Sequence, residues 1–95
     1  MSRIALITGG NRGLGRAAAM VLAEGGTDVV VTYLSHAHEA DNVVSALNAR
    51  GRIALALPLD TTASDSFGRF AQDLAGALEK YWGRRSLDVL INNAG

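Results

Sequence analysis

The chain has no cysteine, a single proline and few aromatic residues. The lack of cysteine excludes a disulfide framework and a thiolate metal site. Nine basic residues balance nine acidic ones and no run of like charge stands out, so nothing points to nucleic acid or an anionic membrane as partner. The apolar runs are interrupted too often to span a bilayer. No signal peptide precedes the first apolar run, and we therefore expect a cytoplasmic protein.

What the chain does have is a high apolar fraction, 48% of 95 residues, which fits a sheet covered on both faces. Short apolar runs alternate with stretches of helical periodicity, and this order predicts a parallel sheet with right-handed crossovers. No linker, repeat or low-complexity tract interrupts residues 1–95, so we expect one domain. The predicted strands cover residues 4–7, 29–33, 53–59 and 87–91.

Three helices are predicted between these strands, each with one apolar face and a glycine near its end. The first runs from residue 14 to about 23, the second follows a Ser35 cap, and the third follows a Thr62 cap with Asp65 in a capping box. The expected apolar faces are Leu14, Ala17, Ala18, Val21 and Leu22 in the first helix, Ala40, Val43, Val44 and Leu47 in the second, and Phe67, Phe70, Ala71, Leu74, Leu78 and Tyr81 in the third.

Residues 8–15 read Thr-Gly-Gly-Asn-Arg-Gly-Leu-Gly and lie between the first predicted strand and the first predicted helix. A pyrophosphate needs backbone N–H donors at close range, and a helix N-terminus supplies them together with a partial positive charge. Glycine is needed where the backbone must turn sharply or approach a ligand, and Gly9, Gly13 and Gly15 stand in such places. An ordinary tight turn is the alternative, but a strand before and a helix after favour a phosphate-binding loop.

Three motifs stand in order along the chain: Thr-Gly-x-x-x-Gly-x-Gly at residues 8–15, Asp60 at the end of the third strand, and Asn-Asn-Ala-Gly at residues 92–95. Together they resemble the motifs of the short-chain dehydrogenase/reductase family. The first and last are similar to those of the 3-oxoacyl-[acyl-carrier-protein] reductase-like branch. The resemblance covers the whole chain and implies a Rossmann-like parallel sheet with helices on both faces. It also implies four strands in the order 3-2-1-4, incomplete relative to the family. The outer edge of the fourth strand would then be open to self-association, and full-length relatives are homo-oligomers.

The resemblance implies nicotinamide dinucleotide as cofactor and a set of residues that would contact it. Asn92 would tie its strand to a neighbour instead, and for Asp60 a helix-capping turn is the alternative. The implied contacts are Gly9, Asn11, Arg12, Gly13, Leu14 and Gly15 with the pyrophosphate and its ribose, Leu34 and Ser35 with the adenosine ribose, Asp60 and Thr61 with the adenine, and Asn93, Ala94 and Gly95 with the nicotinamide-side ribose.

The region after the second strand favours NADP over NAD. NAD-binding proteins usually place a carboxylate about 20 residues beyond the glycine loop, where it binds the ribose 2′-hydroxyl. Residues 33–36 read Tyr-Leu-Ser-His and contain no carboxylate, while Arg12 could pair with the 2′-phosphate of NADP. A solvated surface arginine is the alternative for Arg12. His36 and His38 have no further ligands nearby, so no metal site is predicted.

No catalytic residue is predicted in this sequence. Hydride transfer in the family uses a tyrosine and a lysine spaced Tyr-x-x-x-Lys, with a serine and an asparagine. Ala37 follows Tyr33 at that spacing and Arg85 follows Tyr81, and Lys80 is the only lysine. The resemblance therefore implies the NADP(H)-binding portion of an oxidoreductase that acts on a carbonyl or alcohol, inactive by itself because its catalytic half is absent. A non-catalytic dinucleotide-binding module and an inactive truncated remnant are the alternatives.

Overall fold

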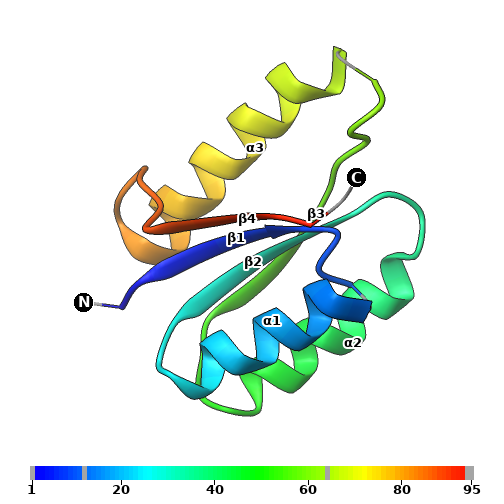
Figure 1. Ribbon diagram of the computed structural model, residues 1–95. Coiled ribbons are helices and arrows are strands. Elements are labelled where there is room, and N and C mark those ends of the chain that lie inside the picture. The colour runs from blue at the N-terminus through cyan, green and yellow to red at the C-terminus, as the bar shows by residue number, and fades with distance from the viewer. Residues whose placement is uncertain (1, 12, 64, 94–95) are drawn as a thin grey trace.

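Strands and helices alternate along the chain in the computed structural model, which describes residues 2–11, 13–63 and 65–93 (Figure 1). This alternation is the one that the sequence predicts. The elements are β1 (Ile4–Thr8), α1 (Gly13–Glu24), β2 (Asp28–Tyr33), α2 (Ala37–Asn48), β3 (Ala54–Pro58), α3 (Asp65–Trp82) and β4 (Val89–Asn92).

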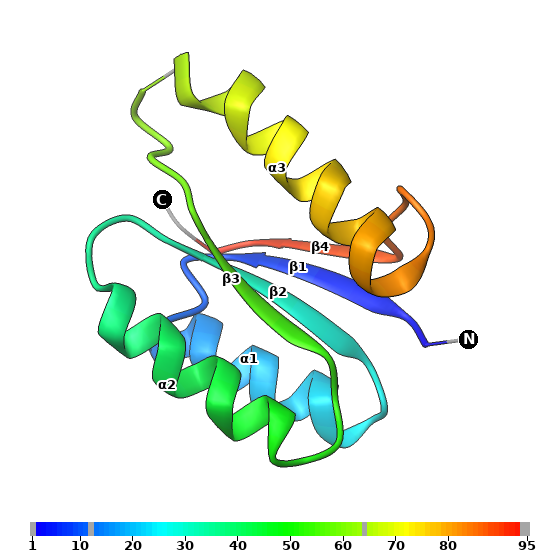
Figure 2. The same cartoon turned by 180° about the vertical axis from the view of Figure 1, so that it is seen from behind.

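The strands form one parallel sheet in the order β3-β2-β1-β4, which confirms the expected order 3-2-1-4. Helices α1 and α2 cover one face and α3 covers the other, as Figures 1 and 2 show from opposite sides. Pro58 ends β3 at an outer position of the sheet, where its missing N–H costs no ladder hydrogen bond. The fold is therefore a Rossmann-like α/β sheet in which the strand order reverses between β1 and β4.

Two apolar layers hold the sheet to its helices. On the side of α1 and α2, the fully buried side chains of Ile7, Val29 and Val31 pack with Val43 and Leu47 of α2. On the side of α3, a smaller cluster joins β1 and β2 to Leu78, with partly buried neighbours from α3 packed around it. Leu90 of β4 is 64% exposed, so α3 covers this second face incompletely in the part of the chain that the structure describes.

The predicted apolar face of α1 is wrong in part. Leu14 is 81% exposed and Val21 is 68% exposed, whereas Ala19 and Ala23 are buried against the sheet. The buried positions, together with Gly15, are all small residues. Small side chains allow the helix to lie close to the strands, and the larger residues are left on its flank. The predicted face of α2 is confirmed, with Ala40, Val43 and Leu47 buried and Val44 partly buried.

In α3 the expected face is buried only in part. Leu78 is buried and Phe70 and Leu74 pack against it partly buried, whereas Phe67 and Tyr81 are each 45% exposed. The helix is inclined to the sheet, so its C-terminal half lies close to the strands while its N-terminal end stands away from them (Figure 2). The part of the apolar face near Phe67 therefore remains accessible in the described structure.

Both predicted helix caps are wrong. The residue before α2 is His36, which makes no side-chain capping bond, and Ser35 Oγ instead lies 3.1 Å from His36 Nδ1. Thr62 does not cap α3, because the helix begins three residues later at Asp65; Thr62 instead donates from its backbone N at 2.9 Å and from its Oγ1 at 2.6 Å to Asp60 Oδ1. A carboxylate two residues earlier thus folds this segment into a turn, and the helix begins at Asp65.

The link between α3 and β4 forms a surface loop. Arg84 Nη2 donates to the Ser2 carbonyl at 3.0 Å and to Asp88 Oδ2 at 2.7 Å, and Asp88 Oδ2 also accepts from the backbone N of Ile4 at 2.8 Å. The bond from Ile4 and then that from Arg84 lower the pKa of Asp88 below its ordinary value of 3.8. This carboxylate therefore ties the start of β1 to the start of β4.

We expect the stabilisation by Asp88 to disappear in acid. A group whose pKa is depressed by folding stabilises the fold above its unfolded pKa and loses that effect as the pH falls through its folded pKa. Wild type should therefore have a higher urea midpoint than Asp88→Asn near neutral pH, and the gap should close at pH values below 3.8. Asp41→Asn, on the exposed side of α2, controls for the change in net charge. A gap that persists undiminished in acid would contradict this role.

Candidate functional site

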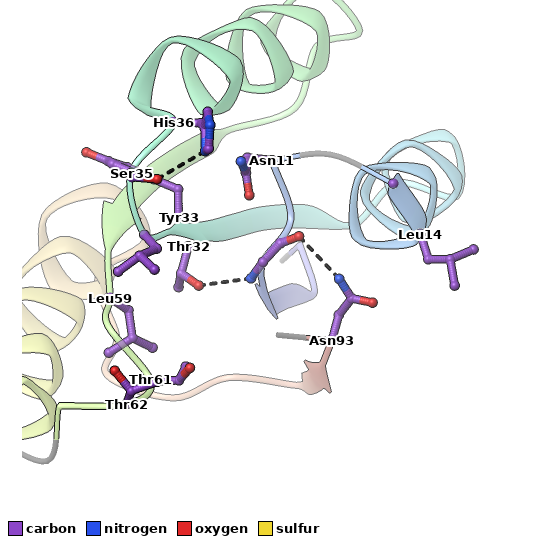
Figure 3. A pocket seen from close by; sticks show the side chains of 13 residues that line it. Asn11, Leu14, Thr32, Tyr33, Ser35, His36, Leu59, Thr61, Thr62 and Asn93 are labelled. Carbon is purple, nitrogen blue, oxygen red and sulfur yellow. Dashed lines mark hydrogen bonds between the residues drawn. The ribbon is translucent and has the colours of Figure 1, made fainter. Parts of the chain in front are cut away.

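A cleft of about 590 Å³ opens at the carboxyl ends of the strands, beside the loop from β1 to α1 (Figure 3). Its volume lies within the range of ligand pockets, roughly 300–1,000 Å³. Open parallel sheets bind ligands at this edge, where neighbouring connections leave in opposite directions. Eight of the residues that the sequence singles out line it together: Gly9, Asn11, Gly13, Leu14, Leu34, Ser35, Thr61 and Asn93.

The two other candidate residues that the structure describes, Gly15 and Asp60, do not line this cleft. Gly15 is buried behind the loop, and Asp60 lines a smaller neighbouring cleft of about 260 Å³ beside α3. Arg12, Ala94 and Gly95 lie outside the described residues. The structure also adds lining residues to which the sequence analysis assigned no cofactor contact: Thr32, Tyr33, His36, Leu59 and Thr62. These residues lie at or shortly after the ends of β2 and β3. Because those strand ends meet at one edge of the sheet, the positions of these residues in the sequence could have predicted that they line the cleft.

Glycine is required in the loop for two different reasons. Gly9 has a φ of +67° and Gly13 a φ of +62°, a region that side chains disfavour. Gly10 and Gly15 are limited by space instead. A Cβ on Gly10 would lie 2.6 Å from Val31 Cγ1, and a Cβ on Gly15 would lie 2.4 Å from the Gly9 carbonyl oxygen. The loop can therefore fold back against β2 and bring the first turn of α1 to the cleft only with glycine at these positions.

Hydrogen bonds from β4 hold the loop from the other side. Thr8 Oγ1 donates to Asn92 Oδ1 at 3.0 Å and accepts from the backbone N of Asn93 at 3.0 Å. The Asn93 side chain donates from Nδ2 to the Gly9 carbonyl at 3.2 Å. Asn92 thus ties its strand to β1 and does not line the cleft, as expected. Asn93 both lines the cleft and supports the loop.

The end of the cleft at β2 carries polar but uncharged groups and one imidazole. Leu34 is 65% exposed, and Ser35 and His36 follow it before α2 begins. None of the lining residues that the structure describes carries a carboxylate. Glu39 of α2 is the nearest acidic group along the chain, and its Oε1 accepts a hydrogen bond from Asn11 Nδ2 at 3.3 Å. This contact links the glycine loop to the first turn of α2.

The carboxylate of Asp60 is engaged in its turn. Hydrogen bonds from the hydroxyl and then the backbone N–H of Thr62 lower the pKa of Asp60 below its ordinary value of 3.8, so the group is ionised at neutral pH. Ser66 Oγ donates to the Asp60 carbonyl at 2.9 Å and joins the turn to the start of α3. Asp60 thus forms a turn before α3, which is the alternative to an adenine contact that the sequence leaves open.

A parallel sheet in the order 3-2-1-4, with a glycine loop before α1 and a cleft at its carboxyl edge, defines a Rossmann-like nucleotide-binding fold. The comparisons identify the family within this class. The profile of the short chain dehydrogenase family matches residues 3–95, and the chain belongs to that family.

The chain is similar to several reductases. It is 35% identical over 95 residues to the 3-oxoacyl-[acyl-carrier-protein] reductase FabG of Staphylococcus aureus, which aligns with 100% of this chain and 36% of the relative. It is 36% identical over 93 residues to the hydroxynaphthalene reductase arp2 of Aspergillus fumigatus, which aligns with 98% of this chain and 32% of the relative. The chain therefore spans about a third of the length of these relatives.

Among solved structures, the chain resembles the angucycline C-6 ketoreductase LanV with bound NADP. The TM-score is 0.93 at 32% identity, and the match covers 98% of this chain and 36% of LanV. Among residues 2–11, 13–63 and 65–93, the structure contains no helix long and apolar enough to cross a membrane. The same residues contain no group of three or more histidine, cysteine or acidic side chains that could hold a metal ion.

Proposed function

We propose that this chain is the NADP(H)-binding portion of a short-chain dehydrogenase/reductase that acts on a carbonyl or alcohol substrate. The observation that carries the proposal is the glycine loop, which brings the start of α1 to the edge of the cleft. The cleft is bordered by Gly9, Asn11, Gly13 and Leu14 from this loop. The first N–H groups of a helix have no intrahelical partner and are suited to a pyrophosphate.

The shape of the loop fits a close approach by a ligand. A Cβ on Gly13 would meet no atom within 4 Å, so the space in front of α1 is open. The positive end of the α1 dipole faces this space and favours an anionic group. When bound, NADPH supplies the hydride, and these residues would bind and orient it. We assign the adenosine ribose to Leu34 and Ser35, and the nicotinamide-side ribose to Asn93.

The charge of the cleft supports NADP in preference to NAD. A carboxylate at the end of β2 would bind the 2′-hydroxyl of NAD and repel the 2′-phosphate of NADP. No described lining residue has one, and the Oε1 atom of Glu39 accepts a hydrogen bond from Asn11. LanV, a relative of this chain, is solved with NADP bound. We therefore propose NADP(H) as the cofactor.

A second candidate is a dinucleotide-binding module without catalytic activity. The observation that favours it is the lack of Tyr-x-x-x-Lys within these 95 residues. General acid-base catalysis needs a proton donor in reach of the carbonyl oxygen, and neither Tyr33 nor Tyr81 is followed by lysine at that spacing. Both candidates bind cofactor, but only the first predicts turnover of a ketone in the natural protein that contains this sequence.

A cofactor titration tests the proposal. We expect NADPH to bind the natural protein at least about tenfold more tightly than NADH, because charge-assisted hydrogen bonds to the 2′-phosphate are worth more than about 1.4 kcal/mol. Binding can be followed by the fluorescence of the reduced nicotinamide. Equal affinity for the two cofactors would overturn the NADP assignment, and no binding of either would overturn the proposed function. Oxidation of NADPH in the presence of simple ketones would then distinguish a reductase from a dinucleotide-binding module without catalytic activity.

A further inference from the structure

The peptide groups of Gly9 are held from both sides of the loop. The Gly9 N–H donates to Thr32 Oγ1 at 3.1 Å, and the Gly9 carbonyl accepts from Asn93 Nδ2 at 3.2 Å. Figure 3 shows Thr32 and Asn93 on opposite sides of the loop, with the two bonds as dashed lines. Thr32 belongs to β2 and Asn93 follows β4, so the two strands that flank β1 both reach its first loop residue.

The orientation of Gly9 determines where α1 begins. With a φ of +67°, Gly9 is in a region that glycine enters and leaves at little cost, so its backbone alone does not fix its direction. The Gly9 carbonyl oxygen lies only 2.4 Å from the position that a Cβ on Gly15 would take. The first turn of α1 is thus packed against this carbonyl, and any rotation at Gly9 moves the helix N-terminus relative to the cleft.

We propose that Thr32 is a positioning residue for the dinucleotide site, an inference that rests on the proposed function. Its hydroxyl holds Gly9, and Gly9 in turn sets the place of the N–H groups at the start of α1. The Thr32 side chain is 1% exposed, so this hydroxyl accepts the bond out of reach of competing water. Because the N–H of Gly9 is used inside the protein, the phosphate donors are the later N–H groups around Gly13 and Leu14.

The requirement is for a hydroxyl and not only for the volume of the side chain. Valine has nearly the shape of threonine but no acceptor, so Thr32→Val would leave the partly buried Gly9 N–H without this partner. Serine keeps the acceptor and loses only a methyl group. The two substitutions therefore separate positioning by the hydrogen bond from packing in the sheet.

The test compares Thr32→Val, Thr32→Ser and wild type in the natural protein, with NADPH as the probe. We expect Thr32→Val to weaken NADPH binding about tenfold and Thr32→Ser to bind within about twofold of wild type, in line with the loss of one partly buried hydrogen bond. The control is Thr27→Val. Thr27 is 8% exposed and precedes the other end of β2, and its substitution should leave NADPH affinity unchanged.

Amide hydrogen exchange at Gly9 gives a second readout that needs no cofactor. We expect the Gly9 amide to exchange at least about tenfold faster in Thr32→Val than in wild type, and at the wild-type rate in Thr32→Ser. Thr32→Val and Asn93→Ala should also be non-additive in NADPH affinity, because both release the same residue. Wild-type affinity and Gly9 protection in Thr32→Val would overturn the inference. Absence of NADPH binding by wild type with fast Gly9 exchange in Thr32→Val would overturn the proposed function alone.

Discussion

Gly15→Ala is expected to weaken NADPH binding at least about tenfold. The added Cβ would lie 2.4 Å from the Gly9 carbonyl oxygen, 2.7 Å from Asn93 Nδ2 and 3.0 Å from Gly10 Cα. Two of these atoms belong to the backbone of the glycine loop and not to a flexible side chain. The first turn of α1 must therefore move from the loop, and the N–H groups that border the cleft move with it.

A matched glycine in another helix controls for the chemistry of the substitution. Gly76 lies in α3, and a Cβ there would meet no atom within 4 Å. Gly76→Ala should leave NADPH affinity unchanged and raise the free energy of unfolding by about 0.5–1 kcal/mol, because alanine is the better helix former. Fluorescence titration and urea unfolding measure the two effects. If Gly15→Ala bound NADPH as Gly76→Ala does, the packing of α1 against the loop would not matter for the site.

Asp28→Ala is expected to lower the free energy of unfolding by about 3 kcal/mol, a large part of the roughly 5–15 kcal/mol that stabilises a small domain. The Asp28 side chain is only 3% exposed. Its Oδ2 accepts from Trp82 Nε1 at 2.7 Å, and its Oδ1 accepts from the backbone N of Ile53 at 3.0 Å. Alanine would remove both acceptors and leave the two donors without their partners.

Urea unfolding followed by tryptophan fluorescence measures this effect directly, because Trp82 is the only tryptophan. Asp28→Asn keeps an oxygen for the N–H of Ile53 and should cost less than Asp28→Ala. Asp41→Asn, on the exposed side of α2, should change the unfolding free energy by no more than about 0.5 kcal/mol. An Asp28→Ala protein as stable as Asp41→Asn would show that the contact with Trp82 does not secure α3. NADPH affinity should be retained in the folded variant, because Asp28 lies at the opposite end of β2 from the cleft.

Local patterns predict most of the fold. The β-branched run around Val29–Val31 and the glycines after each helix are typical of buried parallel strands joined by helical crossovers. Predicted strand boundaries agree with the structure within two residues, because turn residues bracket each apolar run. The glycine loop places four of the eight lining candidates, Gly9, Asn11, Gly13 and Leu14, along the cleft, because glycine spacing and the strand-helix boundary are both local signals.

Packing against distant elements is not visible in such patterns. The residues of α1 offer two apolar faces, one with Leu14 and Val21 and one with Ala19 and Ala23, and the sheet buries the second. Hydrophobicity alone favours the larger side chains. The close approach of α1 to the strands instead favours burial of the smaller side chains. The distance of that approach depends on how α1 and α2 pack together on the sheet.

The sequence by itself determined the alternation of strands and helices, the positions where only glycine fits the loop, and the shortage of groups that would support disulfides, metal binding or Tyr-x-x-x-Lys chemistry. Only the tertiary structure decided what holds the loop and the sheet. Thr32 reaches Gly9 across 23 residues of chain, Asn93 reaches it across 84, and Trp82 reaches Asp28 across 54. These bonds depend on strand order and register, which arise from the packing of the complete sheet and leave no periodic trace in the sequence.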